Sequence, residues 1–205
     1  MEKTTQTDTI PIKTSGVSLT GDLTIPENAA GIVLFSHGSG SSRLSTRNRF
    51  VAEFLQDQGF ATLLFDLLTP EEDLDYSRRF DIKLLTERLI ITTNWLLQQP
   101  RVKDLPIGYF GASTGAASAL GAAAVMNGRV KAVVSRGGRP DLAARALPDV
   151  KSPVLLIVGS RDEPVIEMNQ QAYDLLRCEK KMEIVKGATH LFEEPGTLEQ
   201  VSELA

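Results

Sequence analysis

The feature that most constrains the fold is a regular alternation of short apolar runs with longer amphipathic segments, from residue 31 to the end of the chain. The apolar runs predict strands at 31–36, 61–65, 107–110, 130–135, 154–158 and 182–185, and the amphipathic segments predict helices at 46–58, 82–98, 114–127, 166–178 and 197–204. Strands that alternate with helices in this way form a mostly parallel sheet covered by helices on both faces. We therefore expect an α/β fold.

The N-terminal region follows a different pattern. Between residues 10 and 25 the apolar residues come in short bursts, with Gly16 and Gly21 as turn signals, and this predicts an antiparallel ribbon. Residues 1–9 are polar and are expected to form a loose tail. A chain of 205 residues fits one domain and shows no internal repeat or linker, so we expect a single domain over residues 1–205.

The composition argues against several classes of protein. A net charge of −4 disfavours a dedicated nucleic-acid binder. The single cysteine, Cys178, excludes an internal disulfide and suits a reducing compartment. The polar start of the chain lacks the apolar core of a signal peptide, and no apolar run has the length that spans a membrane. We expect a soluble, cytoplasmic protein without a nucleic-acid or membrane partner.

A Gly-x-Ser-x-Gly pattern from Gly111 to Gly115 joins a predicted strand to a predicted helix. In that position Ser113 would lie on a strained turn that exposes its hydroxyl next to the first free N–H groups of the helix. The pattern alone is weak evidence, so its context decides. Ligands of parallel sheets bind at the carboxyl ends of the strands, and the polar residues at those ends include Ser113, Asp162 and His190, in that order along the chain.

The serine needs a base, and the chain has only two histidines. His190 lies in the loop between the last strand and the last helix, where it can act on Ser113; the alternative is a solvated loop histidine. His37 precedes a Gly-Ser-Gly turn and is expected to stiffen that turn; the alternatives are that it is the base itself or that it contacts a substrate. Asp162 follows a strand end and is expected to orient His190, unless it is a turn acid that caps the next helix. Glu163 is its only close rival.

The tetrahedral intermediate of such a reaction needs two amide donors. We expect them to be the backbone N–H groups of Thr114 and Ser39, with Gly40 as the alternative to Ser39. Arg43 stands where a dinucleotide-binding loop would need its third glycine, and neither a Walker-type loop nor zinc-ligand spacing is present, so no cofactor or metal is expected. Asp66 also ends a strand and is expected to be a structural loop acid.

Two arginines, Arg136 and Arg139, flank a pair of glycines at another strand end. They could bind a carboxylate or phosphate of the substrate. The alternatives are a solvated basic loop or ion pairs with the acidic segment at residues 71–75. The exposed loop at 67–80 is the best candidate for a movable flap, and the loops leave little room for a separate lid domain.

The stretches 35–43, 108–115 and 187–192 resemble the α/β-hydrolase superfamily, and within it the dienelactone hydrolase-like branch, including the bacterial hydrolases found fused to phosphoribosyltransferase domains. The resemblance implies an α/β-hydrolase fold, a triad of Ser113, Asp162 and His190, and hydrolysis of a small ester, thioester or lactone without a cofactor. Dienelactone hydrolases proper use cysteine as the nucleophile, so Ser113 leaves the substrate open. A non-catalytic binding or regulatory module on the same scaffold is the alternative function.

Overall fold

The computed structural model describes residues 6–14 and 16–205, which build one eight-stranded sheet in the order β1-β2-β4-β3-β5-β6-β7-β8. The strands are β1 (Thr7–Thr14), β2 (Val17–Thr24), β3 (Ile32–Ser36), β4 (Ala61–Phe65), β5 (Ile107–Ala112), β6 (Val130–Arg136), β7 (Val154–Gly159) and β8 (Lys180–Val185). The pairs β1·β2 and β2·β4 are antiparallel, and the other neighbours are parallel. The predicted mixed sheet, mostly parallel with an antiparallel N-terminal ribbon, is confirmed.

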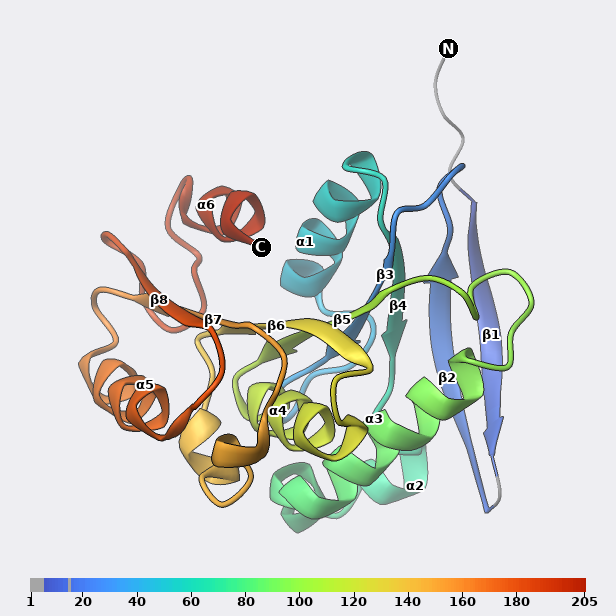
Figure 1. Ribbon diagram of the computed structural model, residues 1–205, viewed down its shortest axis with the longest axis horizontal. Helices are drawn as coiled ribbons and strands as arrows, with labels where there is room; N and C mark the ends of the chain where they lie inside the picture. Colours follow the sequence, from blue (N-terminus) through green and yellow to red (C-terminus); the bar gives the residue numbers. More distant parts are fainter. Residues whose placement is uncertain (1–5, 15) are drawn as a thin grey trace.

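Helices cover both faces of the sheet (Figure 1). The helices are α1 (Thr46–Asp57), α2 (Pro70–Asp73), α3 (Ile82–Leu96), α4 (Thr114–Met126), α5 (Glu163–Leu175) and α6 (Thr197–Leu204). α1 and α6 lie on one face, and α3, α4 and α5 lie on the other. Short 3-10 helices occupy Tyr76–Phe80, Pro140–Ala143 and Leu147–Asp149. No helix among the described residues is long and apolar enough to cross a bilayer.

Helix α4 packs most closely on the sheet because its sequence is rich in alanine and glycine. Nearly all of its residues are buried, including Ala116, Ala119 and Leu120. A side chain at Gly115 would overlap the carbonyl oxygens of Ser36 and His37 at the end of β3. The small residues thus bring the start of α4 against the ends of the central strands, which positions the residue that precedes the helix.

Three details differ from the expectations. β1 begins at Thr7, so residues 7–9 belong to the sheet rather than to a tail, and residues 1–5 lie outside the described part of the chain. Gly21 lies inside β2 opposite Ile10 rather than in a turn; a Cβ there would be 2.9 Å from Ile12 Cδ1, so the missing side chain makes room for the core. α5 begins at Glu163, three residues before the predicted start, because Pro164 suits the first turn of a helix.

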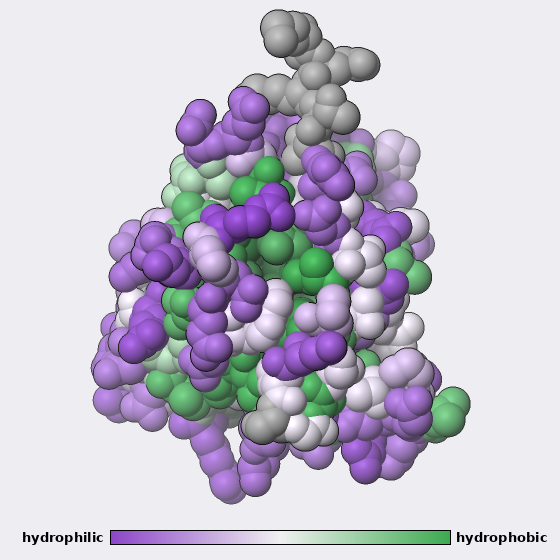
Figure 2. Space-filling view, turned by 90° about the vertical axis from the view of Figure 1, so that its right-hand side faces the viewer, coloured by the Kyte–Doolittle hydropathy of each residue, from purple (hydrophilic) through white to green (hydrophobic). Residues whose placement is uncertain are grey.

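The edge of the sheet that β1 forms is protected against pairing with other chains. Pro11 lacks a backbone N–H, and Lys13 adds a charge to the strand. The side of the molecule that carries β1 is mostly hydrophilic, with hydrophobic residues visible between the polar side chains (Figure 2). The strand-end residues lie at the carboxyl edge of the parallel strands, which is where the functional site is expected.

Candidate active site

Ser113 connects β5 to α4 through a strained backbone conformation. Its φ of 52° and ψ of −123° are unusual for a residue with a side chain. Three backbone hydrogen bonds hold it there: Ser113 N donates to Arg136 O at 3.3 Å, and Ser113 O accepts from Arg139 N at 3.0 Å and from Ala116 N at 3.1 Å. Because the surrounding structure determines this conformation so fully, the strain is retained. The turn has the form expected for a nucleophile.

Glycines give the turn its room. A Cβ on Gly111 would lie 2.5 Å from Ala116 Cα, so only glycine permits the close return of the chain at this point. The turn after β3 packs against the serine from the other side, since a Cβ on Gly38 would lie 3.0 Å from Ser113 Cβ and 3.8 Å from Ser113 Oγ. The loop that was expected to supply an amide donor is therefore in direct contact with Ser113.

Asp162 and His190 come together at the ends of β7 and β8. His190 Nδ1 lies 2.7 Å from Asp162 Oδ2, and the side chains are 38% and 14% exposed. Asp162 occupies the first position before α5, but its side chain makes no capping hydrogen bond. The carboxylate thus bonds to His190 and does not cap α5. With the Nδ1–H donated to Asp162, Nε2 of the neutral ring remains to accept a proton.

The loop that carries His190 is held by contacts on both sides of the histidine. Thr189 N donates to Glu194 Oε2 at 3.1 Å, and hydrogen bonds from Thr189 lower the pKa of Glu194. Arg47 of α1 pairs with Glu193 at 2.9 Å. Phe192 adopts a φ of 57°, which a bulky residue adopts only where its surroundings impose it. These contacts fix the loop against α1.

The end of β6 links the serine to the histidine. Arg136 O accepts the amide hydrogen bond of Ser113, and a Cβ on the next residue, Gly137, would lie 3.0 Å from His190 O and 3.7 Å from His190 Nδ1. Ser113 and His190 thus contact adjacent residues of one strand end. Among the described residues, no hydrogen bond joins Ser113 Oγ to His190.

The two expected oxyanion donors differ in their present partners. Thr114 N begins α4, where helix amides lack intrahelical acceptors, and it has no acceptor within residues 6–14 and 16–205. Ser39 N donates to Thr114 Oγ1 at 2.8 Å. The Ser39 amide is thus already bonded to the side chain of Thr114, whose own amide is the other expected donor. No local sequence pattern predicts this contact, because it joins the Thr114 side chain to a turn 75 residues earlier in the chain.

His37 is buried and uses both ring nitrogens internally. Nδ1 bonds to Gly38 O at 2.9 Å, and Nε2 accepts from Leu67 N at 3.1 Å, so the ring is neutral with its proton on Nδ1. Burial lowers the pKa of His37. These contacts match the expected stiffening of the turn at Gly38 and leave no ring nitrogen for a substrate.

The two arginines considered for substrate binding have different surroundings. Arg139 makes a two-pronged ion pair with Asp141, at 2.9 and 2.8 Å. Arg136 is only 5% exposed and donates to Asn48 Oδ1 at 3.2 Å. Neither pairs with the acidic segment at 71–75, whose partners include Arg78, Arg79 and Arg88.

Two further polar residues near the site have defined partners. Asp66 accepts from the backbone and the side chain of Arg43, as expected of a structural loop acid. Arg79, which the sequence analysis did not single out, lies beside the donor turn, with Nη1 3.8 Å from a Cβ position on Gly40. It is held by Asp73, from the same segment at 67–80. Only the folded chain brings this segment to the turn, so no local pattern marks Arg79.

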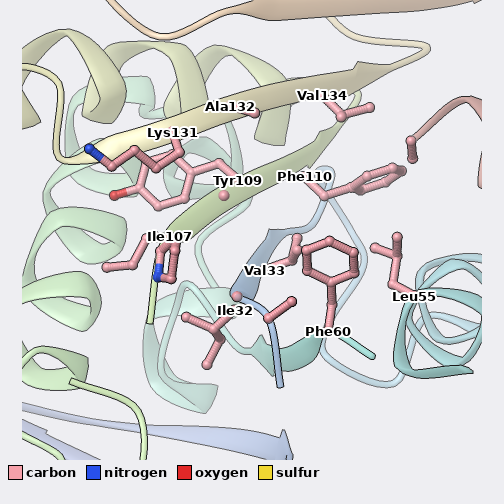
Figure 3. A pocket seen from close by; sticks show the side chains of 15 residues that line it. Ile32, Val33, Leu55, Phe60, Ile107, Tyr109, Phe110, Lys131, Ala132 and Val134 are labelled. Carbon is pink, nitrogen blue, oxygen red and sulfur yellow. The ribbon is translucent and has the colours of Figure 1, made fainter. Parts of the chain in front are cut away.

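An apolar cavity of about 200 Å³ lies elsewhere, between α1 and the face formed by β3, β5 and β6. Val33, Phe60, Phe110 and Val134 point into it, and Lys131 lies at one end (Figure 3). Ser113, Asp162 and His190 are not among the residues that line this cavity. It is therefore separate from the strand-end residues described above.

Comparison with known proteins identifies the family and the fold. The model of the dienelactone hydrolase family matches residues 19–203. A Mycobacterium tuberculosis (strain H37Rv) protein named "Putative phosphoribosyl transferase Rv0571c" is 60% identical over 189 residues. That alignment covers 92% of this chain and 43% of the relative, so the chain spans less than half the length of the curated relatives it matches.

Solved structures share the whole fold. The crystal structure of dienelactone hydrolase from Anabaena variabilis is 55% identical and superimposes with a TM-score of 0.95, covering 98% of this chain and 94% of that one. Est1E from Butyrivibrio proteoclasticus has a TM-score of 0.79 at 17% identity, covering 96% and 95% of the two chains, and shares the fold alone. The family model spans nearly the entire described sheet and its helices, and the chain belongs to the dienelactone hydrolase family, with an α/β-hydrolase fold.

Proposed function

We propose that this chain is a serine hydrolase that cleaves a carboxylic ester, a thioester or a lactone through an acyl-enzyme. In this proposal Ser113 is the nucleophile, His190 the general base and acid, and Asp162 the group that orients His190. The observation that carries it is the 2.7 Å contact between His190 Nδ1 and Asp162 Oδ2, made beside a strained serine turn. Membership of the dienelactone hydrolase family supports the same reaction class.

The reaction divides into two acyl transfers. Ser113 Oγ attacks the carbonyl carbon while its proton passes to His190 Nε2, and the carbonyl oxygen becomes an oxyanion. His190 then returns the proton to the leaving oxygen or sulfur as the bond to that atom breaks. A water molecule attacks the acyl-enzyme in the same manner and regenerates Ser113 Oγ–H. Asp162 stabilises the imidazolium in both halves.

Two amide groups are proposed to bind the oxyanion. Thr114 N–H is unpaired among the described residues, and Gly38, which precedes Ser39, packs against Ser113. Binding of the oxyanion at Ser39 requires Thr114 Oγ1 to give up its 2.8 Å hydrogen bond. The unpaired Thr114 N–H can stabilise the developing charge without such a reorganisation.

The proposed substrates are small acyl compounds. Among the described residues, the longest connection between strands, from β4 to β5, holds α2, a 3-10 helix and α3, so we expect no separate lid domain over the strand ends. One solved structure of Est1E holds ferulic acid, which is a small aromatic acid. A panel of p-nitrophenyl esters, thioesters and lactones of increasing chain length would rank these classes for this chain.

Labelling with a fluorophosphonate probe tests the proposed nucleophile. We expect the wild-type chain to be labelled at Ser113, the Ser113→Ala variant to be unlabelled, and the His190→Ala variant to react far more slowly. Ser77→Ala is a matched control because Ser77 is exposed and, among the described residues, its hydroxyl bonds to Asp75. A wild-type chain that is neither labelled nor able to cleave p-nitrophenyl acetate would instead support the non-catalytic module.

A further inference from the structure

Arg136, the last residue of β6, is a buried cation without an acidic partner. Its side chain is 5% exposed, and within the described residues no carboxylate forms an ion pair with it. Its buried Nε has no hydrogen-bond partner in that part of the chain. Isolating a charge from water costs several kcal/mol in proteins, by order of magnitude, unless other interactions compensate. The buried charge of Arg136 must therefore be stabilised by contacts other than an ion pair.

The guanidinium of Arg136 bridges two elements. Nη2 donates to Asn48 Oδ1 of α1 at 3.2 Å, and the guanidinium carbon lies 5.8 Å from the centre of the Phe192 ring. Asn48 and Phe192 are each 2% exposed, so the whole assembly is sealed from solvent. Phe192 follows His190 by two residues, which means that the guanidinium supports the loop that carries the proposed base.

Arginine suits this position better than a neutral residue. Its planar group donates a hydrogen bond in its plane and binds an aromatic ring with its face, and the second interaction gains strength when it is removed from water. Burial and the nearby Arg47 lower the pKa of Arg136 to about 10, so the group stays protonated at neutral pH. The charge needed for the ring contact is therefore retained.

The contacts around Arg136 converge on His190. The backbone carbonyl of Arg136 accepts the Ser113 amide, and its neighbour Gly137 lies against His190. A second link runs in parallel, from Arg47 of α1 to Glu193. Phe192 holds a strained φ of 57°, and such a conformation persists only while its surroundings impose it. Removal of the guanidinium would release the ring that fixes this strained residue.

We propose that Arg136 is a positioning residue that holds the His190 loop on α1 through Phe192 and Asn48, and so sets the geometry of the proposed base. This inference rests on the proposed serine hydrolase function. It differs from the direct binding of a substrate anion, because Asn48 and Phe192 seal the guanidinium on two sides. Its effect is expected on the chemical step rather than on substrate affinity.

Kinetics of Arg136→Met and Arg136→Lys test the proposal, with Arg145→Met, an exposed arginine of the segment between β6 and β7, as the control. We expect Arg136→Met to lower kcat for p-nitrophenyl acetate at least tenfold with KM within twofold of wild type. Arg136→Lys should recover part of the loss, since it restores the charge without the planar group. Arg145→Met should retain wild-type kcat. An unchanged kcat in Arg136→Met would overturn the proposal.

A carboxylate-bearing ester separates positioning from substrate binding. If Arg136→Met raises KM for the anionic ester alone and leaves kcat for the neutral ester unchanged, Arg136 is a substrate subsite and the proposal fails. Should Arg136→Met not fold, Phe192→Leu replaces it, because that change keeps an apolar side chain and removes the ring face. It should show the same loss of kcat at constant KM, and a wild-type kcat would overturn the proposal.

Proton NMR of the imidazole groups provides a readout that does not require activity. The chain has two histidines, so the Nδ1–H of His190 bonded to Asp162 can be assigned with His37→Gln. We expect this resonance to broaden or shift in Arg136→Met and to persist in Arg145→Met. If the wild type proves inactive, the proposed function fails, while the NMR comparison still decides whether Arg136 positions His190. An unaltered resonance in Arg136→Met would contradict that role.

Discussion

The amide of Ser39 donates a hydrogen bond to Thr114 Oγ1 across 2.8 Å. Thr114 follows Ser113, the proposed nucleophile, and its hydroxyl thus occupies an N–H group that is proposed to bind the oxyanion. Thr114 is 4% exposed, and its hydroxyl therefore has few alternative partners. In the proposed reaction, an oxyanion that forms on Ser113 would compete with this hydroxyl for the Ser39 N–H. In the free protein the Thr114 hydroxyl occupies that N–H.

Replacement of Thr114 by valine removes this competitor at nearly constant volume. The Ser39 amide then lacks its acceptor in the free protein, which should lower the free energy of unfolding by about 1 to 3 kcal/mol. The same unpaired donor should bind the oxyanion more strongly, and we expect fluorophosphonate labelling to become several-fold faster. Thr114→Ser should match the wild type in both measurements. Slower labelling of Thr114→Val with unchanged stability would show that the hydroxyl assists the reaction.

Loss of the carboxylate of Asp162 should disable His190. In Asp162→Asn the side-chain amide no longer favours the His190 tautomer that carries its proton on Nδ1, and it cannot stabilise the imidazolium, so we expect kcat to fall by on the order of 10³ to 10⁴-fold. The melting temperature should change little, because the carboxylate makes no helix-capping bond. Glu163→Gln is the control for charge at the start of α5. Equal losses in the two variants would argue against a specific role for Asp162.

Addition of a single methyl group at Gly115 should prevent the close approach of α4 to β3. The new Cβ would overlap the backbone carbonyls of Ser36 and His37, which cannot move without disturbing the sheet. We expect Gly115→Ala to lose about 3 kcal/mol or more of stability in urea denaturation. Gly108→Ala is the matched control in β5, since its nearest new contact is an ordinary 3.7 Å. Similar stability of the two variants would refute the packing argument.

The buried His37 should make stability depend on pH. Burial lowers its pKa in the folded protein below the ordinary 6.5, so the unfolded chain binds more protons as the pH falls past that value. This contribution is present in full above pH 6.5 and is lost below it, by at most about 1.4 kcal/mol per pH unit. Urea unfolding between about pH 7.5 and 5.5 should show a smaller slope for His37→Gln. An identical slope in both proteins would contradict the assignment of a neutral His37.

The segment at 67–80 is anchored more firmly than its exposure implies. Glu72 caps α2 together with Thr69, and it also pairs with Arg88 of α3 at 2.5 Å. We expect Arg88→Met to increase trypsin cleavage after Arg78 and Arg79 several-fold. Arg101→Met, which removes an exposed pair with Asp8, serves as the control. Equal cleavage in wild type and Arg88→Met would show that this ion pair does not restrain the segment.

The fold follows from information that is local in the sequence. Apolar runs such as 61–65 and helix patterns such as 197–204 recur at the spacing of a parallel sheet, and both were predicted with the bounds that the structure has. The same local information predicted a sharp turn at Ser113, because the glycines at 111 and 115 allow the close return of the chain that such a turn needs. Boundaries shifted where a single residue decided them, as Pro164 did for α5.

The local sequence is sufficient to place Ser113, Asp162 and His190 at the ends of predicted strands. What each of these side chains contacts depends on the folded chain. It turned the carboxylate of Asp162 toward His190 rather than to the helix, used both nitrogens of His37 internally, and buried Arg136 against Phe192. The physical reason is that secondary structure depends on neighbours within a few residues. Hydrogen bonds at this site join residues as far apart as Arg47 and Glu193, which are separated by 146 positions, and no local pattern records them.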